Sequence, residues 1–303
     1  MSGAATVLQP PGIGSDAASA PSLVAIIGSE QQANVDLTNA WRASGLPSIL
    51  LPAREATMLL GPGDTALARL DVLPTLDGIE DGMDDLDEVA FRGARLLNSR
   101  HALECSHDKL HTAACLVTAR LPHPKTVHLP RAGAPLGLRP PFVLKPRHGS
   151  WGFDVFLCET ESAAAVVLDE IRDRPWFTRH GAILQEVAPL TGRDLRILVA
   201  NGRCVGAIER VAASGEWRTN VALGGSRAPV RPAPEATRLA IAAAAAIGAD
   251  FVGVDLLRVD GGYVVLELNG AVEFDNVYDI DGNDVYLQVA DALGLNVPSA
   301  VTV

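Results

Sequence analysis

The chain has 303 residues, of which 48% are hydrophobic, and its formal net charge at pH 7 is −11. This length exceeds one average domain, so we expect two or three domains with cores of their own. The negative charge and the scattered arginines argue against a nucleic-acid-binding surface, which needs clustered Lys and Arg. No apolar run is long enough to span a membrane, so we expect a cytoplasmic protein without a membrane partner.

Residues 1–20 lack the basic region and apolar stretch of a secretory signal, and we interpret them as a disordered leader. The four cysteines, Cys105, Cys115, Cys158 and Cys204, form no CxxC pair and have no histidine-rich spacing. This pattern argues against a zinc site and against a disulfide framework. We expect four buried, reduced thiols.

The segment after the leader has the pattern of a small α/β lobe. An apolar run at residues 22–29 precedes an amphipathic helix at about 31–44 and a second apolar run. This β-α-β order predicts a parallel sheet. Further strands are expected at residues 66–73 and 93–98, so the small lobe is predicted to cover residues 21–98.

From residue 99 the sequence becomes helical in character. Ser106 is the expected N-cap of a helix that begins near Asp108 and Lys109. A short strand and a linker rich in proline and glycine follow this helix.

A lysine and a glycine loop come next in the chain. Residues 142–146 form a predicted strand that carries Lys145, and the loop after it contains Gly149 and Gly152. Such glycines let backbone N–H groups approach a phosphate closely, although two glycines at a hairpin tip more often mark only an ordinary turn. A helix at residues 162–173 and a strand that ends in Gln185 and Glu186 complete this part.

The dipeptide Asn201-Gly202 predicts a β-hairpin. Its strands carry Asp194, Arg196 and Arg210, and an ordinary Arg–Glu pair within the hairpin is the alternative reading of Arg196. The polar, glycine-rich residues 217–225 are expected to form a loop that lines a site. A helix at residues 234–247 leads to the last hairpin.

The most informative segment is residues 251–269, which predicts two strands joined by a tight Asp-Gly-Gly turn. Asp255 is the only carboxylate of the first strand, and Glu267 and Asn269 share one face of the second strand. Three oxygen ligands can therefore meet across the hairpin, as a hard cation such as Mg²⁺ requires. The alternative is a surface cross-strand pair, but the apolar surroundings argue that these carboxylates are buried and need a partner.

The order of these segments resembles the ATP-grasp superfamily, and most closely its RimK-like and LysX-like carboxylate–amine ligases of the α-L-glutamate ligase type. The resemblance covers about residues 97–295 and is carried by SHDKLHT, LPHPKTV, VLKP, HGSWGFDV, LQEV, GRDLRILV, ERV, WRTNVALGG, GVDLL and LELN. Each stretch is ordinary alone, but the series in this order is highly specific. It implies an α/β protein: an ATP-grasp fold of α+β type after a small Rossmann-like domain. The implied units are residues 21–98, a central subdomain at 99–188 with the glycine loop, and a C-terminal subdomain at 189–303 with the metal site.

The resemblance also implies roles for individual residues. Lysines and the glycine loop would contact the ATP phosphates, a strand end would take the adenine, and a nearby carboxylate would lie on the ribose side. The implied nucleotide-binding residues are Lys109, Lys145, Gly149, Ser150, Trp151, Gly152, Gln185, Glu186, Val187, Asp194, Arg218, Thr219 and Asn220. Arg196, Arg210 and Asn269 would act at the reacting groups. Asp255, Glu267 and Asn269 would hold two Mg²⁺ ions, bridged by Glu267, and Mn²⁺ could replace Mg²⁺.

Two stretches depart from the family pattern. Close relatives have a small residue, Pro and Gly after the asparagine, whereas this chain continues with a segment that contains Glu273 and Asp275. These two carboxylates are expected to alter the amine-binding side. The glycine loop carries the bulky Trp151 and Phe153, so its closure over the γ-phosphate is expected to differ.

The implied activity is an ATP-dependent ligase that joins a carboxylate to an amine through an acyl phosphate. The amine is expected to be an amino acid such as glutamate, and the acceptor a protein, a peptide or a small molecule. A nucleotide-binding regulatory protein that no longer catalyses, and a kinase on the same fold, are the alternatives. A homo-oligomer is expected because dimers and tetramers are common in the family.

Overall fold

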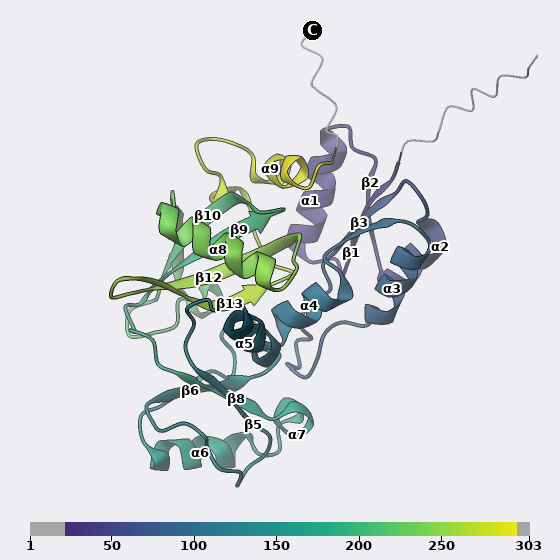
Figure 1. Ribbon diagram of the computed structural model, residues 1–303. Coiled ribbons are helices and arrows are strands. Elements are labelled where there is room, and N and C mark those ends of the chain that lie inside the picture. The colour runs from purple at the N-terminus through teal and green to yellow at the C-terminus, as the bar shows by residue number, and fades with distance from the viewer. Residues whose placement is uncertain (1–21, 296–303) are drawn as a thin grey trace, which may run out of the picture.

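The computed structural model describes residues 22–295, and the expected leader at residues 1–20 lies outside this range. Three sheets organise the chain (Figure 1). The elements in chain order are β1 (Val24–Ile27), α1 (Gln32–Ala43), β2 (Ser48–Leu51), α2 (Ala53–Leu59), β3 (Thr65–Ala68), α3 (Met83–Phe91), β4 (Arg95–Leu97), α4 (Arg100–His107), α5 (Lys109–Thr118), β5 (Thr126–Leu129), β6 (Phe142–Pro146), β7 (Phe156–Cys158), α6 (Glu161–Ile171), α7 (Pro175–His180), β8 (Ala182–Glu186), β9 (Arg193–Ala200), β10 (Arg203–Val211), η1 (Val221–Leu223), β11 (Ser226–Pro229), α8 (Pro234–Ala246), β12 (Phe251–Val259), β13 (Gly262–Asn269), η2 (Asn276–Tyr278) and α9 (Val285–Ala292).

The N-terminal sheet is parallel, with strand order β2-β1-β3-β4. Side chains of β1 alternate between its faces: Val24 and Ile26 belong to the core that contains α1, whereas Ala25 and Ile27 pack with α2 and α3. Burial on both faces is the usual environment of a parallel sheet. The predicted β-α-β beginning and its parallel sheet are confirmed.

The strand expected at residues 66–73 is shorter than predicted, because β3 ends at Ala68. Beyond it Asp71 bends the chain: its Oδ1 accepts a hydrogen bond from the backbone N–H of Val72, 2.7 Å away. The following loop carries Leu76, which is 5% exposed, into the core of the central sheet. Asp71 thus lies just beyond the carboxyl end of a parallel strand, where open α/β sheets bind ligands.

The expected helix around residue 106 is two helices, α4 and α5, that meet at Asp108. Ser106 is not an N-cap, because it lies inside α4 and its hydroxyl donates to the Leu103 carbonyl at 3.0 Å. Asp108 is the N-cap of α5, since its Oδ1 accepts from the N–H of Leu110 at 3.0 Å. An aspartate is as good an N-cap as a serine, so the sequence offered two candidates two residues apart.

The central sheet is antiparallel, with strand order β5-β8-β6-β7. Phe142, Leu144 and Leu184 pack on the face covered by α6 and α7. Val143 and Lys145 alternate with them and therefore face the opposite side. That side looks toward the C-terminal sheet (Figure 1).

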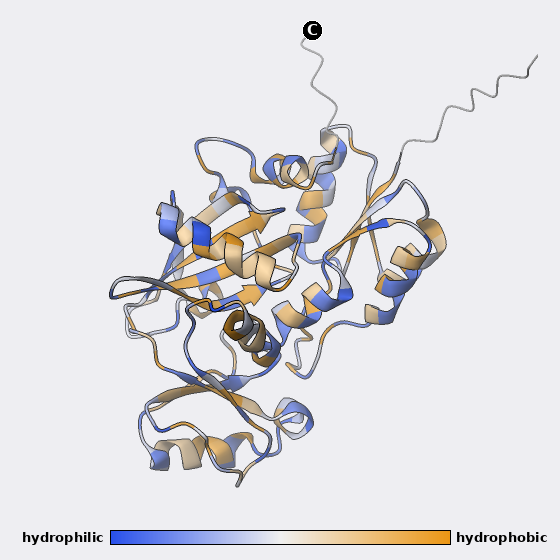
Figure 2. Cartoon of the chain, viewed as in Figure 1, coloured by the Kyte–Doolittle hydropathy of each residue, from blue (hydrophilic) through white to orange (hydrophobic). Residues whose placement is uncertain are grey.

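The C-terminal sheet is antiparallel, with strand order β11-β10-β9-β12-β13, and contains both predicted hairpins. Helix α8 covers one face, and α9 packs on β10 and on α1. The Trp41 indole N–H of α1 donates to the Tyr286 carbonyl of α9 at 2.9 Å. The strands that meet in this core are predominantly hydrophobic in Figure 2. One core cluster therefore joins the N-terminal sheet to the C-terminal sheet.

Two expectations about composition can be compared with the fold. All four cysteines are free, but only Cys105 and Cys158 are buried, so the expectation of four buried thiols is wrong for Cys115 and Cys204. The latter two lie at the margin of the core under α8, where side chains are only partly covered. Among the described residues, no helix combines the length and the apolar character that crossing a bilayer requires.

Candidate active site

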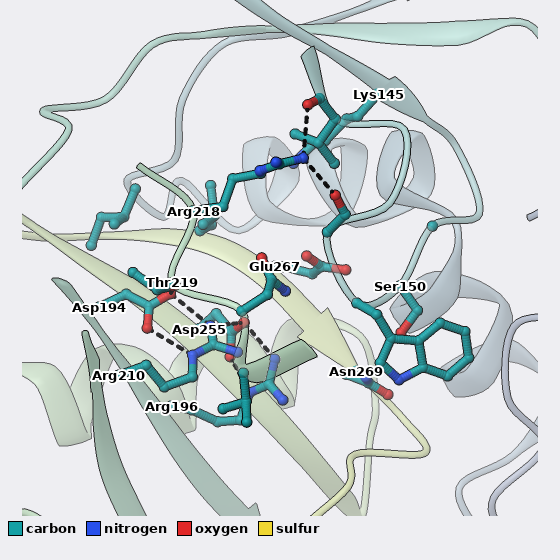
Figure 3. Close-up of a pocket in the computed structure, with 18 of the residues that line it drawn as sticks. Lys145, Ser150, Asp194, Arg196, Arg210, Arg218, Thr219, Asp255, Glu267 and Asn269 are labelled. Atoms are coloured by element: carbon teal, nitrogen blue, oxygen red, sulfur yellow. Dashed lines mark hydrogen bonds and ion pairs between the residues drawn. The ribbon is translucent and has the colours of Figure 1, made fainter. Parts of the chain in front are cut away.

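A cavity of about 350 Å³ lies between the central and C-terminal sheets and collects almost all the predicted site residues (Figure 3). The predicted residues that line it are Lys109, Lys145, Gly149, Ser150, Trp151, Gly152, Gln185, Glu186, Asp194, Arg196, Arg210, Arg218, Thr219, Asn220, Asp255, Glu267 and Asn269. Val187 is the exception, because β8 ends at Glu186 and the next residue leaves the wall. The volume is within the range of small-molecule sites.

One face of the C-terminal sheet changes character along its strands. Leu198 and Ala200 on β9 belong to the apolar core, whereas Arg196, two residues earlier, lines the cavity. Strand pairing places Asp255 directly opposite both Arg196 and Glu267. Directly paired residues of antiparallel strands share a face, so the register fixes a charged row at the cavity end of an otherwise apolar surface.

Asp255 is the centre of an ion-pair network. Arg196 donates to Oδ1 from Nε at 2.6 Å and to Oδ2 from Nη2 at 2.8 Å. Arg210 donates from Nη2 to the same Oδ2 at 2.6 Å and also forms a fork with Asp194 at 2.8 and 2.6 Å. The Thr219 hydroxyl completes the network with a 2.6 Å bond to Asp194. Neither alternative from the sequence holds: Arg196 pairs with an aspartate of another hairpin, and Asp255 is only 4% exposed.

The network fixes the charge states of its members. Burial opposes ionisation of Asp255, but Arg196 and Arg210 hold its pKa well below the usual range. Burial also opposes the charge of Arg210, yet Asp255 and Asp194 raise its pKa above the ordinary value. Asp255 and the two guanidinium groups that hold it are therefore all ionised in a largely buried region.

Glu267 joins this network to two lysines. Its Oε1 lies 2.8 Å from Nζ of Lys109, which also donates to the Gly149 carbonyl at 2.5 Å. Burial works against the charge of Glu267, but Lys109 and Lys145 lower its pKa. Lys145 is 5% exposed and donates to Oε1 of Gln185 at 3.0 Å. In Figure 3 Glu267 lies between the arginine network and Lys145. Both lysines are largely covered, with Lys109 10% and Lys145 5% exposed.

The glycine loop is held down by the polar loop 216–220. Arg218 donates from Nη1 to the carbonyls of Gly152 and Val155 at 3.0 and 3.3 Å. Nη2 of Arg218 donates to Oε2 of Glu216 at 2.7 Å, and this bond orients the guanidinium. Gly152 has φ +79°, and a Cβ there would lie 2.6 Å from Oδ1 of Asn220, so only glycine fits this contact. Arg218 is therefore a clamp on the loop as well as part of the cavity wall.

The hairpin carboxylates fit a hard divalent cation by their chemistry. Oδ1 of Asp255 accepts one hydrogen bond and Oδ1 of Asn269 accepts one, from the Ala271 N–H at 3.0 Å. A carboxylate or amide oxygen has two acceptor positions, so each retains one. Within residues 22–295 no group of three His, Cys, Asp or Glu side chains is arranged to hold a metal ion. The predicted trio has only two such residues, and its third ligand is an amide, which agrees with an oxygen site of the Mg²⁺ type.

Several polar residues of the cavity wall were not assigned a role from the sequence, among them Asp71, Arg227 and Tyr278. Glu273, which was expected to alter the amine-binding side, also lines the cavity. Asp71 was missed because the predicted strand at residues 66–73 extended past it. Its position just after a parallel strand is the signal that could have identified it. Asp275 does not line the cavity; it pairs with Arg227. A further feature that the sequence did not predict is a bulge between Asp255 and Leu256 in the pairing of β12 with β13. Such bulges commonly change the direction of side chains beside active sites.

Comparison with known proteins identifies the family. The family model described as a RimK-like ATP-grasp domain matches residues 107–293. A probable α-L-glutamate ligase of Aeromonas salmonicida is 32% identical over 260 residues, 84% of this chain and 83% of the relative. One of Parasynechococcus marenigrum is 33% identical over 202 residues, and this match spans 64% of this chain but only 42% of that relative.

A solved structure agrees in fold. The structure of the ATP-grasp ligase PsnB, complexed with a minimal precursor, Mg and ADP, has a TM-score of 0.65 at 16% identity and covers 91% of this chain and 98% of that one. The predicted ATP-grasp fold class is thus confirmed, and so is the assignment to ATP-dependent ligases that form carbon–nitrogen bonds. The chain belongs to the RimK-like ATP-grasp family.

Proposed function

We propose that the protein joins a carboxylate to an amine through an acyl phosphate, with an amino acid such as glutamate as the amine substrate. The names of the relatives support glutamate. The precursor complexed with PsnB supports a peptide or protein as the acceptor, and a small molecule is the other acceptor that we consider. The observation that carries the proposal is the cross-strand pair of buried Asp255 and half-buried Glu267. The pair lies on the cavity wall among Lys109, Lys145, Arg196 and Arg210.

We further propose that the chain divides into the three units expected from its sequence. Residues 21–98 would contribute Asp71, residues 99–188 the lysines and the glycine loop, and residues 189–303 the arginines and the metal ligands. This division is supported by the three sheets, one in each unit. The cytoplasmic location and the homo-oligomeric state stay predictions.

In the proposed reaction an oxygen of the substrate carboxylate attacks the γ-phosphorus of ATP, and the bond from phosphorus to the bridging oxygen breaks to release ADP. The amine then attacks the acyl carbon, loses a proton, and phosphate leaves. In both steps negative charge on the phosphoryl or acyl oxygens must be stabilised, so catalysis depends on positioning and electrostatic stabilisation. Lys109 and Lys145 would face the phosphates, and Arg196 and Arg210 would orient the carboxylate. Gln185, Glu186 and Val187 would take the adenine, and Asp194 would lie on the ribose side.

The metal ligands would be Asp255, Glu267 and Asn269. Two Mg²⁺ ions, or Mn²⁺ in their place, would neutralise charge on the transferred phosphoryl group when bound. The residues fit because two ionised carboxylates and one amide oxygen converge on the cavity. Ser150, Trp151 and the glycines of the loop would cover the γ-phosphate, with Thr219 and Asn220 beside it.

The test is incubation with Mg-ATP and amino acid pools, followed by measurement of ADP, phosphate and product mass. We expect ADP and free phosphate in equal amounts and a product heavier by one amino acid residue. ADP without free phosphate, and a phosphorylated product, would identify a kinase. If no amino acid stimulates ADP release, the protein is a nucleotide-binding regulator and the proposal is wrong.

The pH dependence of kcat/KM for ATP should report the protonation state of Lys145. Burial lowers the pKa of Lys145 to about 8, even though Glu267 acts in the opposite direction. The lysine is therefore cationic below this pH and becomes neutral as the pH rises through it, which weakens binding of the triphosphate. We expect kcat/KM for ATP, which reports the free enzyme, to fall about tenfold per pH unit above about pH 8. A profile that stays flat to about pH 10 would remove Lys145 from the phosphate site.

The Arg218 clamp should protect the acyl phosphate from water. In Arg218→Met the bonds to the Gly152 and Val155 carbonyls are lost, and the loop covers the intermediate less well. We expect more phosphate per molecule of amide product, by roughly threefold or more. The matched control is Arg172→Met at the C-cap of α6, because the Arg172 side chain is 59% exposed. An unchanged ratio of phosphate to amide would show that the clamp does not guard the intermediate.

A further inference from the structure

Arg227 extends the arginine row of the site by one strand. It lies on the edge strand β11, and strand pairing places it directly opposite Arg210 of β10. The two side chains therefore share the face that lines the cavity. Neighbouring strands lie about 4.8 Å apart, so Arg227 is about one strand spacing farther from Asp255 than Arg210 is.

Arg227 differs from the inner arginines in how it is neutralised. Arg196 and Arg210 are bound by Asp255 and Asp194, and their side chains are 16% and 5% exposed. Within residues 22–295 the Arg227 side chain makes one hydrogen bond, from Nη2 to Oδ2 of Asp275 at 2.5 Å. This side chain is 34% exposed. A guanidinium has five N–H donors. Most donors of Arg227 are thus available on the cavity side.

Asp275 holds Arg227 from outside the cavity. Its other oxygen, Oδ1, accepts from the N–H of Val277 at 3.0 Å and so begins η2. The segment is fixed by Phe274 and Tyr278, which are 3% and 1% exposed. A Cβ on Gly206 of β10 would lie 2.9 Å from the Tyr278 carbonyl, so the segment packs closely against the sheet. Asp275 is therefore a rigid support for the guanidinium.

Tyr278 adds a polar group beside the three arginines. It lines the cavity, and burial raises the pKa of its phenol although Arg196, Arg210 and Arg227 act in the opposite direction. The phenol is therefore neutral at physiological pH and can donate a hydrogen bond. An anion at Arg227 would therefore contact a guanidinium and a hydroxyl group, which are hydrogen-bond donors typical of carboxylate-binding sites.

We propose that Arg227, oriented by Asp275, binds a carboxylate that takes no part in bond formation, carried by the amino acid substrate of the proposed ligase. The reacting carboxylate would occupy the inner arginines, one strand away. The amino group of an α-amino acid is two bonds from its carboxylate carbon, so capture at Arg227 would direct the amine inward. This inference rests on the proposed function and specifies its amine as an α-amino acid rather than a simple amine.

The experiment is calorimetric titration of L-glutamate into protein saturated with Mg²⁺ and a non-hydrolysable ATP analogue. Arg227→Gln should raise the Kd for L-glutamate at least about tenfold, the value of a charge-assisted hydrogen bond. The matched control is Arg231→Gln, because Arg231 pairs with Asp281 but is 74% exposed and lies outside the cavity. This control should bind as the wild type does, since exposed pairs contribute little.

Two further probes identify the source of the carboxylate. 4-Aminobutyrate, which lacks the α-carboxylate, should bind weakly and be insensitive to Arg227→Gln. N-acetyl-L-glutamate lacks a free amine, so a raised Kd for it in Arg227→Gln would place the same carboxylate contact on the acid substrate. Equal Kd values in Arg227→Gln and Arg231→Gln for all probes, or no binding of L-glutamate to wild type, would overturn the inference.

Asp275 acts through Arg227 and is a positioning residue. Asp275→Ala should raise the Kd for L-glutamate less than Arg227→Gln does and leave affinity for the ATP analogue unchanged. The double variant should be no weaker than Arg227→Gln alone, because the two substitutions disable one contact. Additive effects would contradict this coupling. Because the titration requires no turnover, failure of Arg227 to matter is distinguishable from failure of the ligase proposal.

Discussion

Replacement of Glu267 by alanine is expected to lower ligase turnover at least about a thousandfold, the upper range for the loss of one preorganised electrostatic contact. Glu267 would help to hold the metal ions of the proposed site, and its Oε1 lies 2.8 Å from Nζ of Lys109. Its loss would remove a metal ligand and leave Lys109 and Lys145 without their shared counter-charge. Steady-state ADP release in the presence of the preferred amino acid measures the effect.

Glu209→Ala is the matched control for this variant. Glu209 lies on β10, pairs with Arg193, and has a side chain that is 39% exposed. It does not line the cavity, so turnover should be unchanged. Glu267→Gln retains the size of the side chain and should be as inactive as the alanine variant if charge is what matters. Turnover within tenfold of wild type in a folded Glu267→Ala protein would contradict the metal assignment.

Local sequence pattern predicted most of the hairpin side of the site. Side chains alternate along a strand, so Glu267 and Asn269 must share a face. The two-residue turn alone would place Asp255 opposite Leu266, and the bulge between Asp255 and Leu256 shifts the pairing by one residue to Glu267. The same rules predicted the hairpin at Asn201 and Gly202.

The partners of these residues depend on strand order, which is not a local property. Arg196 and Arg210 reach Asp255 because β9 lies between β10 and β12, and no spacing in the sequence states that order. Asp71 enters the cavity from a different sheet, after a strand that ends five residues earlier than expected. The η2 segment that follows Asp275 packs on β10 and β11, and this packing is likewise not a local property. The contacts that depend on assembly of the sheets were therefore what the local pattern could not predict.

Removal of Arg210 is expected to destabilise the whole protein as well as stop catalysis. Its guanidinium holds Asp194 and Asp255, whose side chains are 2% and 6% exposed. In Arg210→Leu both carboxylates lose a buried partner, which costs about 3–5 kcal/mol of unfolding free energy. This corresponds to a fall in Tm of about 10 °C. Arg203→Leu on the same strand is the control, because the Arg203–Asp291 pair is 52% and 65% exposed and should matter by less than about 1 kcal/mol.

The pH dependence of Arg210→Leu separates a charge effect from a packing effect. In the wild type the pKa of Asp255 is held below its unfolded value, so its contribution to stability is present above that value and is lost as the pH falls through the folded pKa. In the variant Asp255 keeps Arg196 but loses Arg210, so burial should raise its pKa relative to that in the wild type. The deficit in stability is then largest at neutral pH and is relieved as the pH falls through this raised pKa. We therefore expect the difference in Tm between wild type and variant to narrow as the pH falls from about 7 to about 3. A difference that stays constant over this range would show that Arg210 stabilises the sheet by packing and not by neutralising Asp255.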